Sequence, residues 1–175
     1  FRHKREAGGM IQRKDLSRIF ERMADLLEIR GENVFRIRAY RRASQTLDTF
    51  SGDLQRRVND GTLEKISGIG KDLSQKITEF YQTGRIEAYE RLVKGMPKGV
   101  VDLLEVPGLG PKGAKLISEQ LKVGSLKQLK AAAQSHRIQS LPGFSEKKEA
   151  NLLKGLEILE IQTSSDYMIM ILGKS

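Results

Sequence analysis

The chain has 175 residues, with 31 Lys or Arg against 22 Asp or Glu, so its formal net charge is +9. The absence of Cys excludes disulfide frameworks, thiolate metal sites and cysteine nucleophiles, and no apolar run approaches the roughly 20 residues that a membrane span needs. The charge favours a polyanionic partner, although solvated basic faces explain it equally well.

The first part of the chain has the apolar spacing of amphipathic helices. Residues 1–9 lack the apolar core of a signal peptide and are interpreted as a disordered basic tail or a remnant of cloning, with Met10 as the expected start. Residues 13–30 place apolar side chains every three or four positions, which predicts a helix that Gly31 ends. Asn33 is expected to cap a second helix. The polar side of that helix carries Arg36, Arg38, Arg41 and Arg42.

Glycine and proline then divide the chain. Further helices are expected at about 71–82 and 86–94. The segment KGMPKG, Lys94–Gly99, combines two Gly with a Pro and is the expected boundary between two halves. We therefore expect one domain at 10–95 and a second at 96–160.

The second half is also expected to be helical. Residues 100–106, VVDLLEV, could form a strand or a buried helix, and the helical surroundings favour the helix. Pro111 is expected to begin one helix and Ser125 to cap another. Residues 161–175 change from Ser-rich to almost wholly apolar, and are interpreted as a strand cut off from a following domain or as a sticky tail. The predicted fold class is all-α.

One pattern occurs three times and is the most informative feature of the sequence. The copies begin at Ile66, Val106 and Leu141, and in each an apolar residue precedes x-Gly-apolar and then a helix. In the third copy Ser145 replaces the second Gly. Glycine allows two helices to be joined this tightly. The helix that follows exposes unpaired backbone amides with a partial positive charge, and such a turn suits a phosphate.

The repeat therefore supplies candidate phosphate contacts. They are Gly68, Gly70 and Lys71 in the first copy, and Gly108, Gly110, Lys112 and Lys115 in the second, with Lys147 and Lys148 after the third. Nothing in such a turn reads base edges, so binding should be independent of sequence and sensitive to salt. The alternative is that the three turns are merely tight helix connections. A dinucleotide-binding site at 108–113 is disfavoured because no parallel strand is expected before it.

Three segments resemble the family X DNA polymerases. Residues 66–92, ISGIGKDLSQKITEFYQTGRIEAYERL, and 106–117, VPGLGPKGAKLI, are similar to the two helix-hairpin-helix motifs of that family. Residues 34–44, VFRIRAYRRAS, resemble the preceding helix of its amino-terminal lyase domain, especially in bacterial members. The resemblance covers about 13–160. It implies a helical lyase-type domain and a second helix-hairpin-helix domain with a degenerate third copy, which together bind gapped or 5′-phosphorylated DNA in base excision repair.

The resemblance also implies a cation and excludes one activity. Family hairpins hold Na⁺ or K⁺ through backbone carbonyls, which here belong to Glu64, Ile66 and Ile69, and to Leu104, Val106 and Leu109. Polymerase chemistry in the family needs an Asp-x-Asp pair that binds two metal ions. Asp166 is the single acid after Glu160, so neither a divalent site nor polymerase activity is expected of this chain alone. No organic cofactor is expected.

Lys76 matches the family lysine that forms a Schiff base with an abasic sugar. In the aligned repeats its position holds Leu116 and then Asn151, which suggests a partly desolvated site that would lower the pKa of the amine. Asp72 lies four residues earlier on the same helix face and would raise that pKa, which opposes nucleophilicity. Lys76 is therefore either a lyase nucleophile or a non-catalytic phosphate contact.

The family's 5′-phosphate pocket is matched only in part. Tyr40 is the matching residue, Arg36 keeps the charge of a family lysine, and Arg41 lies beside them. Glu64 stands where animal members have a lysine and Phe35 where they have a histidine. Two alternatives to a lyase stay open: a non-catalytic DNA-binding module, and a protein-interaction scaffold in which the hairpins only pack helices. If the chain binds DNA, as a lyase or as a binding module, its expected location is cytoplasmic and nucleoid-associated.

Overall fold

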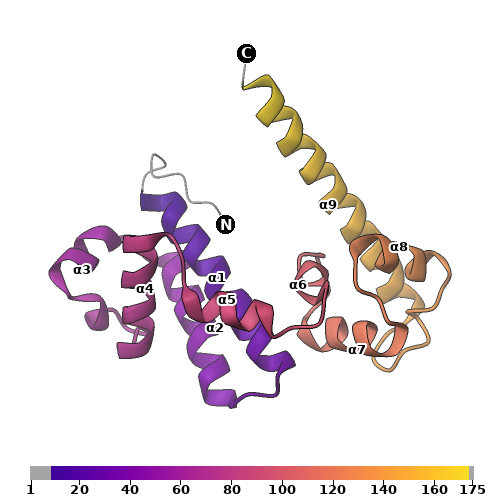
Figure 1. Cartoon of the computed structure of the whole chain (residues 1–175), viewed down its shortest axis with the longest axis horizontal. Helices are drawn as coiled ribbons and strands as arrows, with labels where there is room; N and C mark the ends of the chain where they lie inside the picture. The colour runs from indigo at the N-terminus through magenta and orange to yellow at the C-terminus, as the bar shows by residue number, and fades with distance from the viewer. Residues whose placement is uncertain (1–8, 174–175) are drawn as a thin grey trace. The chain divides into compact units, whose positions relative to one another are not determined.

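The structure is a computed structural model that describes residues 9–173 (Figure 1). Within these residues it consists of nine α-helices and one short 3-10 helix, with no strand, so the all-α prediction is confirmed. The predicted basic tail lies outside the described residues, except for Gly9, which begins the first helix. The chain divides into two compact units, Phe1–Gly95 and Met96–Ser175.

The first unit is built on a pair of long helices. Its elements are α1 (Gly9–Ile29), α2 (Val34–Thr49), α3 (Leu54–Asp60), a 3-10 turn (Leu63–Lys65), α4 (Lys71–Thr83) and α5 (Glu87–Lys94). The short link between α1 and α2 makes them pack side by side (Figure 1). Their facing stripes bury Phe20, Met23, Tyr40 and Leu47. The Phe20 and Tyr40 rings meet edge to face, with centroids 5.7 Å apart.

The predicted helix boundaries follow from local chemistry. Gly31, at φ 72°, takes the left-handed conformation just beyond the end of α1. The Asn33 side chain accepts a hydrogen bond from the Phe35 amide at 2.8 Å and so caps α2. These contacts fix the direction in which α2 leaves the turn, and hence which of its side chains face α4.

The second unit is built around two further hairpins. Its helices are α6 (Val100–Leu103), α7 (Pro111–Leu121), α8 (Leu126–Gln134) and α9 (Glu146–Leu172). The expected helix at 100–106 therefore ends at Leu103, and the remaining residues form the turn into the hairpin. Ser125 caps α8 by accepting from the Gln128 amide, as its position predicts. Gly155 of α9 packs so closely that a Cβ there would lie 2.6 Å from the Pro107 carbonyl oxygen.

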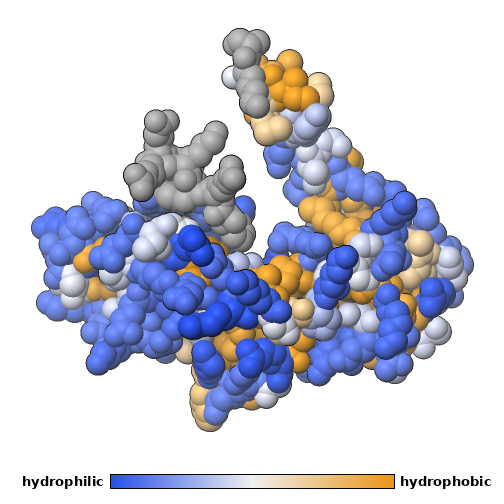
Figure 2. Space-filling view, viewed as in Figure 1, coloured by the Kyte–Doolittle hydropathy of each residue, from blue (hydrophilic) through white to orange (hydrophobic). Residues whose placement is uncertain are grey.

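The carboxyl-terminal segment differs from the expectation of a strand or a tail. Residues 161–172 continue α9, which is a single helix of 27 residues. No Gly or Pro interrupts the chain between Gly155 and Gly173, so the helix started by the packed residues continues through the apolar run. Tyr167, Ile169 and Leu172 are exposed there, and Figure 2 shows hydrophobic side chains at this end of α9. Among the described helices, none is both long and apolar enough to cross a membrane.

Candidate nucleic-acid interface

The first hairpin joins the 3-10 turn to α4 through Gly68 and Gly70. Gly68 has φ 95°, a conformation that L side chains rarely adopt. The Ile69 amide donates to the Ile66 carbonyl at 3.0 Å and closes the turn. Gly70 is extended, with φ −89° and ψ −177°, and its carbonyl accepts from the Ser74 amide at 2.9 Å to start α4.

The second hairpin repeats this geometry. Gly108 has φ 87°, and the Leu109 amide donates to the Val106 carbonyl at 3.1 Å. Gly110 is extended, with φ −88° and ψ 179°, and its carbonyl accepts from the Ala114 amide at 2.9 Å. Two different sequences thus adopt one backbone conformation.

The first turns of α4 and α7 present unpaired amides. Neither Gly70 nor Gly110 supplies a capping side chain. Among the described residues no acceptor pairs with the first three amides of α4, which belong to Lys71, Asp72 and Leu73. The same is true of the Lys112 and Gly113 amides of α7, and Leu73 and Gly113 hold the third helical position in each case. A Cβ built on either capping glycine would meet nothing within 4 Å, so both helix ends are open to an approaching ligand. Amides of this kind bind anions.

The third hairpin keeps the turn but satisfies part of its own backbone. Gly143 has φ 80°, and the Phe144 amide donates to the Leu141 carbonyl at 3.0 Å. The Ser145 hydroxyl accepts from the Lys148 amide at 3.1 Å. The Lys148 ammonium in turn donates to the Gly143 carbonyl at 2.6 Å. One serine therefore removes an amide that the other two hairpins leave for a ligand.

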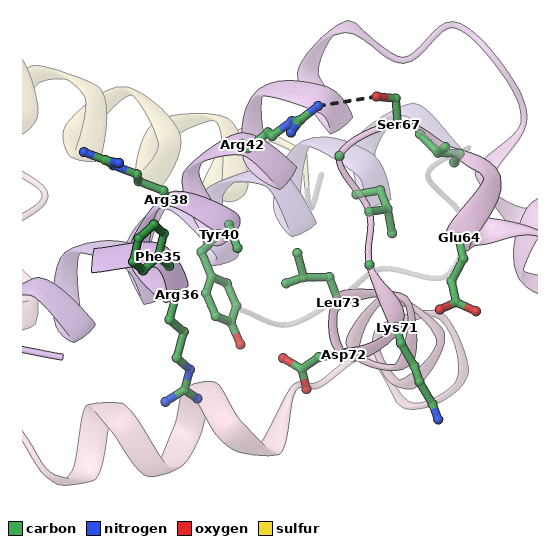
Figure 3. Close-up of a pocket in the computed structure, with 15 residues that line it drawn as sticks. Phe35, Arg36, Arg38, Tyr40, Arg42, Glu64, Ser67, Lys71, Asp72 and Leu73 are labelled. Carbon is green, nitrogen blue, oxygen red and sulfur yellow. Dashed lines mark hydrogen bonds between the residues drawn. The ribbon is translucent and has the colours of Figure 1, made fainter. Parts of the chain in front are cut away.

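A cavity of about 700 Å³ lies between α2 and the first hairpin (Figure 3). Sequence reasoning named several of its lining residues: Arg36, Tyr40, Glu64, Ile66, Gly68, Ile69, Gly70 and Lys71. It did not select Phe35, Arg38, Arg42 or Ser67 as contacts, although they also line the cavity. The signal was present, because Phe35, Arg38 and Arg42 recur at helical spacing along one stripe of α2.

Tyr40 contributes a buried hydroxyl to this cavity. The residue is 1% exposed, and its hydroxyl makes no hydrogen bond of standard geometry among the described residues, although the Lys76 amine lies near enough to interact with it. Figure 3 shows the hydroxyl directed toward the cavity side of Asp72. A ligand oxygen in the cavity could accept a hydrogen bond from this hydroxyl.

Arg41 is the expected phosphate contact that the structure places elsewhere. Its guanidinium faces α1, where it lies 2.6 Å from Glu21, 3.1 Å from Asp25 and 3.8 Å from Glu28. Burial alone would lower the pKa of Arg41, but these carboxylates outweigh it and raise the pKa. Arg41 does not line the cavity. Successive residues of a helix point about 100° apart, so a helix that turns Arg41 toward α1 turns Arg42 to a different side. The next residue, Arg42, does line the cavity.

Comparison with known proteins agrees with this geometry. Residues 11–86 match a helix-hairpin-helix domain, and residues 100–157 match a SAM-like helix-hairpin-helix tandem. Over 146 residues the chain is 34% identical to "DNA polymerase/3'-5' exonuclease PolX" of Bacillus subtilis (strain 168), an alignment that covers 83% of this chain and 25% of that protein. The chain is a helix-hairpin-helix protein related to the bacterial family X DNA polymerases. It spans about a quarter of the length of that relative.

In this chain, the amine of Lys76 is held as a cation. Its Nζ atom lies 2.7 Å from Asp72 Oδ1, and its side chain is 14% exposed. Burial on its own lowers the pKa of Lys76, but the hydrogen bond and charge of Asp72, together with the nearby Tyr40, outweigh it and raise the pKa. Both effects that the sequence predicted are present: burial is the largest single influence on this pKa, and Asp72 and Tyr40 together outweigh it.

A second cavity, of about 520 Å³, lies between the second and third hairpins. Gly108, Gly110 and Lys112 line one side, and Gly143 and Lys148 line the other. The positions equivalent to Lys76 also line this cavity and are Leu116 and Asn151. Lys115, in contrast, is exposed outside the cavity lining.

Most of the hairpin carbonyls that the sequence named as cation ligands accept no backbone hydrogen bond within the described part of the chain. The carbonyls of Ile66 and Val106 each accept one backbone hydrogen bond. From the described residues, no backbone amide donates to the carbonyls of the other expected ligands, Glu64, Ile69, Leu104 and Leu109. Neutral carbonyl oxygens of this kind suit hard cations. The part of the chain that the structure describes has no cluster of three His, Asp or Glu that could hold a metal ion.

Proposed function

We propose that this chain binds DNA through backbone phosphates and does not read base sequence. The observation that carries the proposal is the pair of hairpins that share one geometry and leave first-turn amides without acceptors among the described residues. A net charge of +9 supports an anionic partner. Because backbone contacts release condensed counterions, affinity should fall steeply with salt.

We assign a terminal 5′-phosphate to the cavity between α2 and the first hairpin. Arg36, Arg42 and the Tyr40 hydroxyl can donate from the α2 wall, and the α4 amides with Lys71 can donate from the hairpin. A terminal phosphate has three oxygens to accept these bonds, more than an internal phosphodiester has. Gapped or 5′-phosphorylated repair intermediates are therefore the proposed substrates.

The second hairpin is proposed to hold duplex backbone through Gly108, Gly110 and Lys112, with Lys115 as a peripheral charge. A Na⁺ or K⁺ ion on the hairpin carbonyls would link the backbone to a DNA phosphate in both copies. No step of the proposal requires a divalent ion or an organic cofactor.

We place the chain as the DNA-holding portion of a family X enzyme in base excision repair, working at the nucleoid.

A salt series tests this function. The chain is titrated with a gapped duplex, a 5′-phosphorylated nick and unrelated intact duplexes between low and physiological salt. Binding should weaken linearly on logarithmic axes, should vary little with sequence, and should be tightest for the 5′-phosphorylated DNA. A flat salt response would instead favour the protein-interaction scaffold.

A 5′-deoxyribose-phosphate lyase is the second candidate function. It is favoured by the burial of the Lys76 side chain next to Tyr40, a residue of the cavity lining. A neutral Lys76 amine would add to the sugar aldehyde and lose water to form a Schiff base. Loss of a C2′ proton would then break the C3′–O bond and leave the downstream strand with a 5′-phosphate, and water would hydrolyse the imine to free the sugar phosphate and the lysine. Borohydride reduces such an imine, so incised abasic DNA should become covalently attached to the wild type and not to Lys76→Ala. Without a covalent product, the chain is a binding module.

A further inference from the structure

The third hairpin has a lysine ammonium bound to its own backbone. The Lys148 side chain donates to the Gly143 carbonyl at 2.6 Å, and the Lys148 amide is held by the Ser145 hydroxyl at 3.1 Å. In the first two hairpins the equivalent carbonyls belong to Gly68 and Gly108, and no backbone amide of the described residues donates to them. The third hairpin therefore pairs a carbonyl that the other two leave open.

The lysine that makes this contact is particular to the third copy of the repeat. Lys148 lies seven residues after Leu141, where that copy begins. The equivalent residues of the first and second copies are Leu73 and Gly113. Neither has a charged side chain, so of the three hairpins only the third can place an ammonium against its carbonyl from this position.

Lys148 also lines the cavity of about 520 Å³ between the second and third hairpins, and Lys112 lines the opposite side. The lining residues include no carboxylate, and neither lysine forms an ion pair with an acid of the described residues. Glu149, the acid next to Lys148 in sequence, is bound instead by the amides of Ile138 and Gln139. Two unneutralised ammonium groups thus border one space, which suits an anion.

A lysine ammonium has three N–H donors, and the bond to Gly143 uses one of them. We propose that Lys148 is a built-in cation that links the third hairpin to a DNA backbone phosphate, the task proposed for Na⁺ or K⁺ at the other two hairpins. This inference rests on the proposed DNA binding and adds a third contact to it. Because the charge is covalently attached, this contact should need no ion from solution.

The test measures affinity for an intact duplex at constant ionic strength, with K⁺ or tetramethylammonium as the monovalent cation. Lys148→Met removes the charge and frees the Gly143 carbonyl. In tetramethylammonium this variant should bind about ten-fold more weakly than the wild type, since one charge-assisted contact is lost. In K⁺ the loss should be smaller, because K⁺ binds backbone carbonyls and can take the vacated place.

Lys147→Met is the matched control, because Lys147 is the adjacent exposed lysine and does not line the cavity. It should lose the same factor in both salts, since its charge acts only through general attraction. Lys148→Gln keeps a donor for the Gly143 carbonyl and removes the charge, so it should lose more affinity than Lys147→Met in both salts. Urea unfolding of each variant separates a loss of binding from a loss of folding.

The outcomes separate this inference from the proposed function. A loss in Lys148→Met that is equal in the two salts and no larger than that of Lys147→Met would overturn the built-in cation and leave DNA binding by the other hairpins standing. Unchanged affinity in a folded Lys148→Met or Lys148→Gln would overturn it as well. Wild-type binding that does not respond to salt concentration would overturn this inference and the proposed function together.

Discussion

Lys76 and Asp72 form an ion pair of 2.7 Å along one face of α4, and this contact, together with Tyr40, raises the pKa of the candidate nucleophile. Asp72→Asn removes the charge and leaves the burial that lowers the pKa of Lys76. Each unit by which this pKa falls raises the fraction of neutral amine about ten-fold at neutral pH.

We therefore predict that Asp72→Asn increases borohydride trapping on incised abasic DNA and moves the pH profile of trapping to lower pH. Lys76→Ala and the double variant should give no adduct. Equal trapping rates and equal pH profiles for the wild type and Asp72→Asn would show that the ion pair does not control the amine.

Substitution of two neighbouring arginines should change two different quantities, stability for Arg41 and DNA affinity for Arg42. Arg41→Ala leaves the carboxylates of Glu21 and Asp25 without their shared cation, so it should destabilise the first unit by roughly 1–2 kcal/mol and leave DNA affinity nearly unchanged. Arg42→Ala should weaken DNA binding and change stability little. Urea unfolding and DNA titration measure both quantities on both variants. Loss of DNA affinity in Arg41→Ala without unfolding would return that residue to the binding site.

The stability loss in Arg41→Ala should also depend on pH. Burial raises the pKa of Asp25 above its usual 3.8, and Arg41 is the main opposing influence. Because the folded state then binds the Asp25 proton more tightly than the unfolded state, protonation favours folding. Removing Arg41 raises the pKa further, so the loss should be largest near pH 7 and shrink as pH falls through the raised value. A loss that does not change with pH would contradict this account.

Glu149 holds the loop before the third hairpin. It is 2% exposed and accepts hydrogen bonds from the amides of Ile138 at 3.0 Å and Gln139 at 2.7 Å, while His136 Nδ1 lies 2.8 Å from its other oxygen. Glu149→Ala should cost about 2–4 kcal/mol of unfolding free energy, because the buried Ile138 amide and the partly buried Gln139 amide lose their acceptor. Glu149→Gln, which keeps one acceptor oxygen, should cost less. Urea unfolding, with the exposed Glu146→Ala as control, measures both losses, and equal values for Ala and Gln would contradict this reason.

The hairpin carbonyls predict an effect of cation identity. At constant ionic strength, replacement of K⁺ by tetramethylammonium should weaken DNA binding, because the bulky ion cannot enter a site made of backbone carbonyls. Counterion release is matched between the two salts, so any difference reports a specific site. Identical binding isotherms would remove the monovalent ion from the proposal.

The helices and turns were predictable because their signals are local. The spacing of apolar residues defined α1 and α2, and Asn33, Pro111 and Ser125 marked helix starts by their own hydrogen-bonding chemistry. The carboxyl-terminal part of α9 was not predictable, because a continuous apolar run has no period that separates a helix from a strand. Its helical state follows from continuation of the packed segment around Leu156.

The candidate site was predictable in its backbone and less so in its side chains. Gly68 and Gly108 specify the turn, since few other residues adopt their φ values. The choice between Arg41 and Arg42 required the packing of α2 on α1, which a one-residue change in helix rotation reverses. The balance at Lys76 likewise depended on a distance to Asp72 that spacing alone leaves open.

The most direct measurement uses the third hairpin as a template for the other two. Gly70→Ser and Gly110→Ser place at each open helix end the residue that caps α9, where Ser145 accepts from the Lys148 amide. Both glycines are extended with no atom within 4 Å of a built Cβ, so the fold should tolerate serine, with stability changed by only a few tenths of a kcal/mol.

If bare amides bind the DNA backbone, the double variant should bind a gapped duplex at least about ten-fold more weakly, since one charge-assisted hydrogen bond is lost at each hairpin. Ser145→Gly should bind as well as the wild type or better. Affinity for DNA that is unchanged in a folded Gly70→Ser, Gly110→Ser variant would contradict the account.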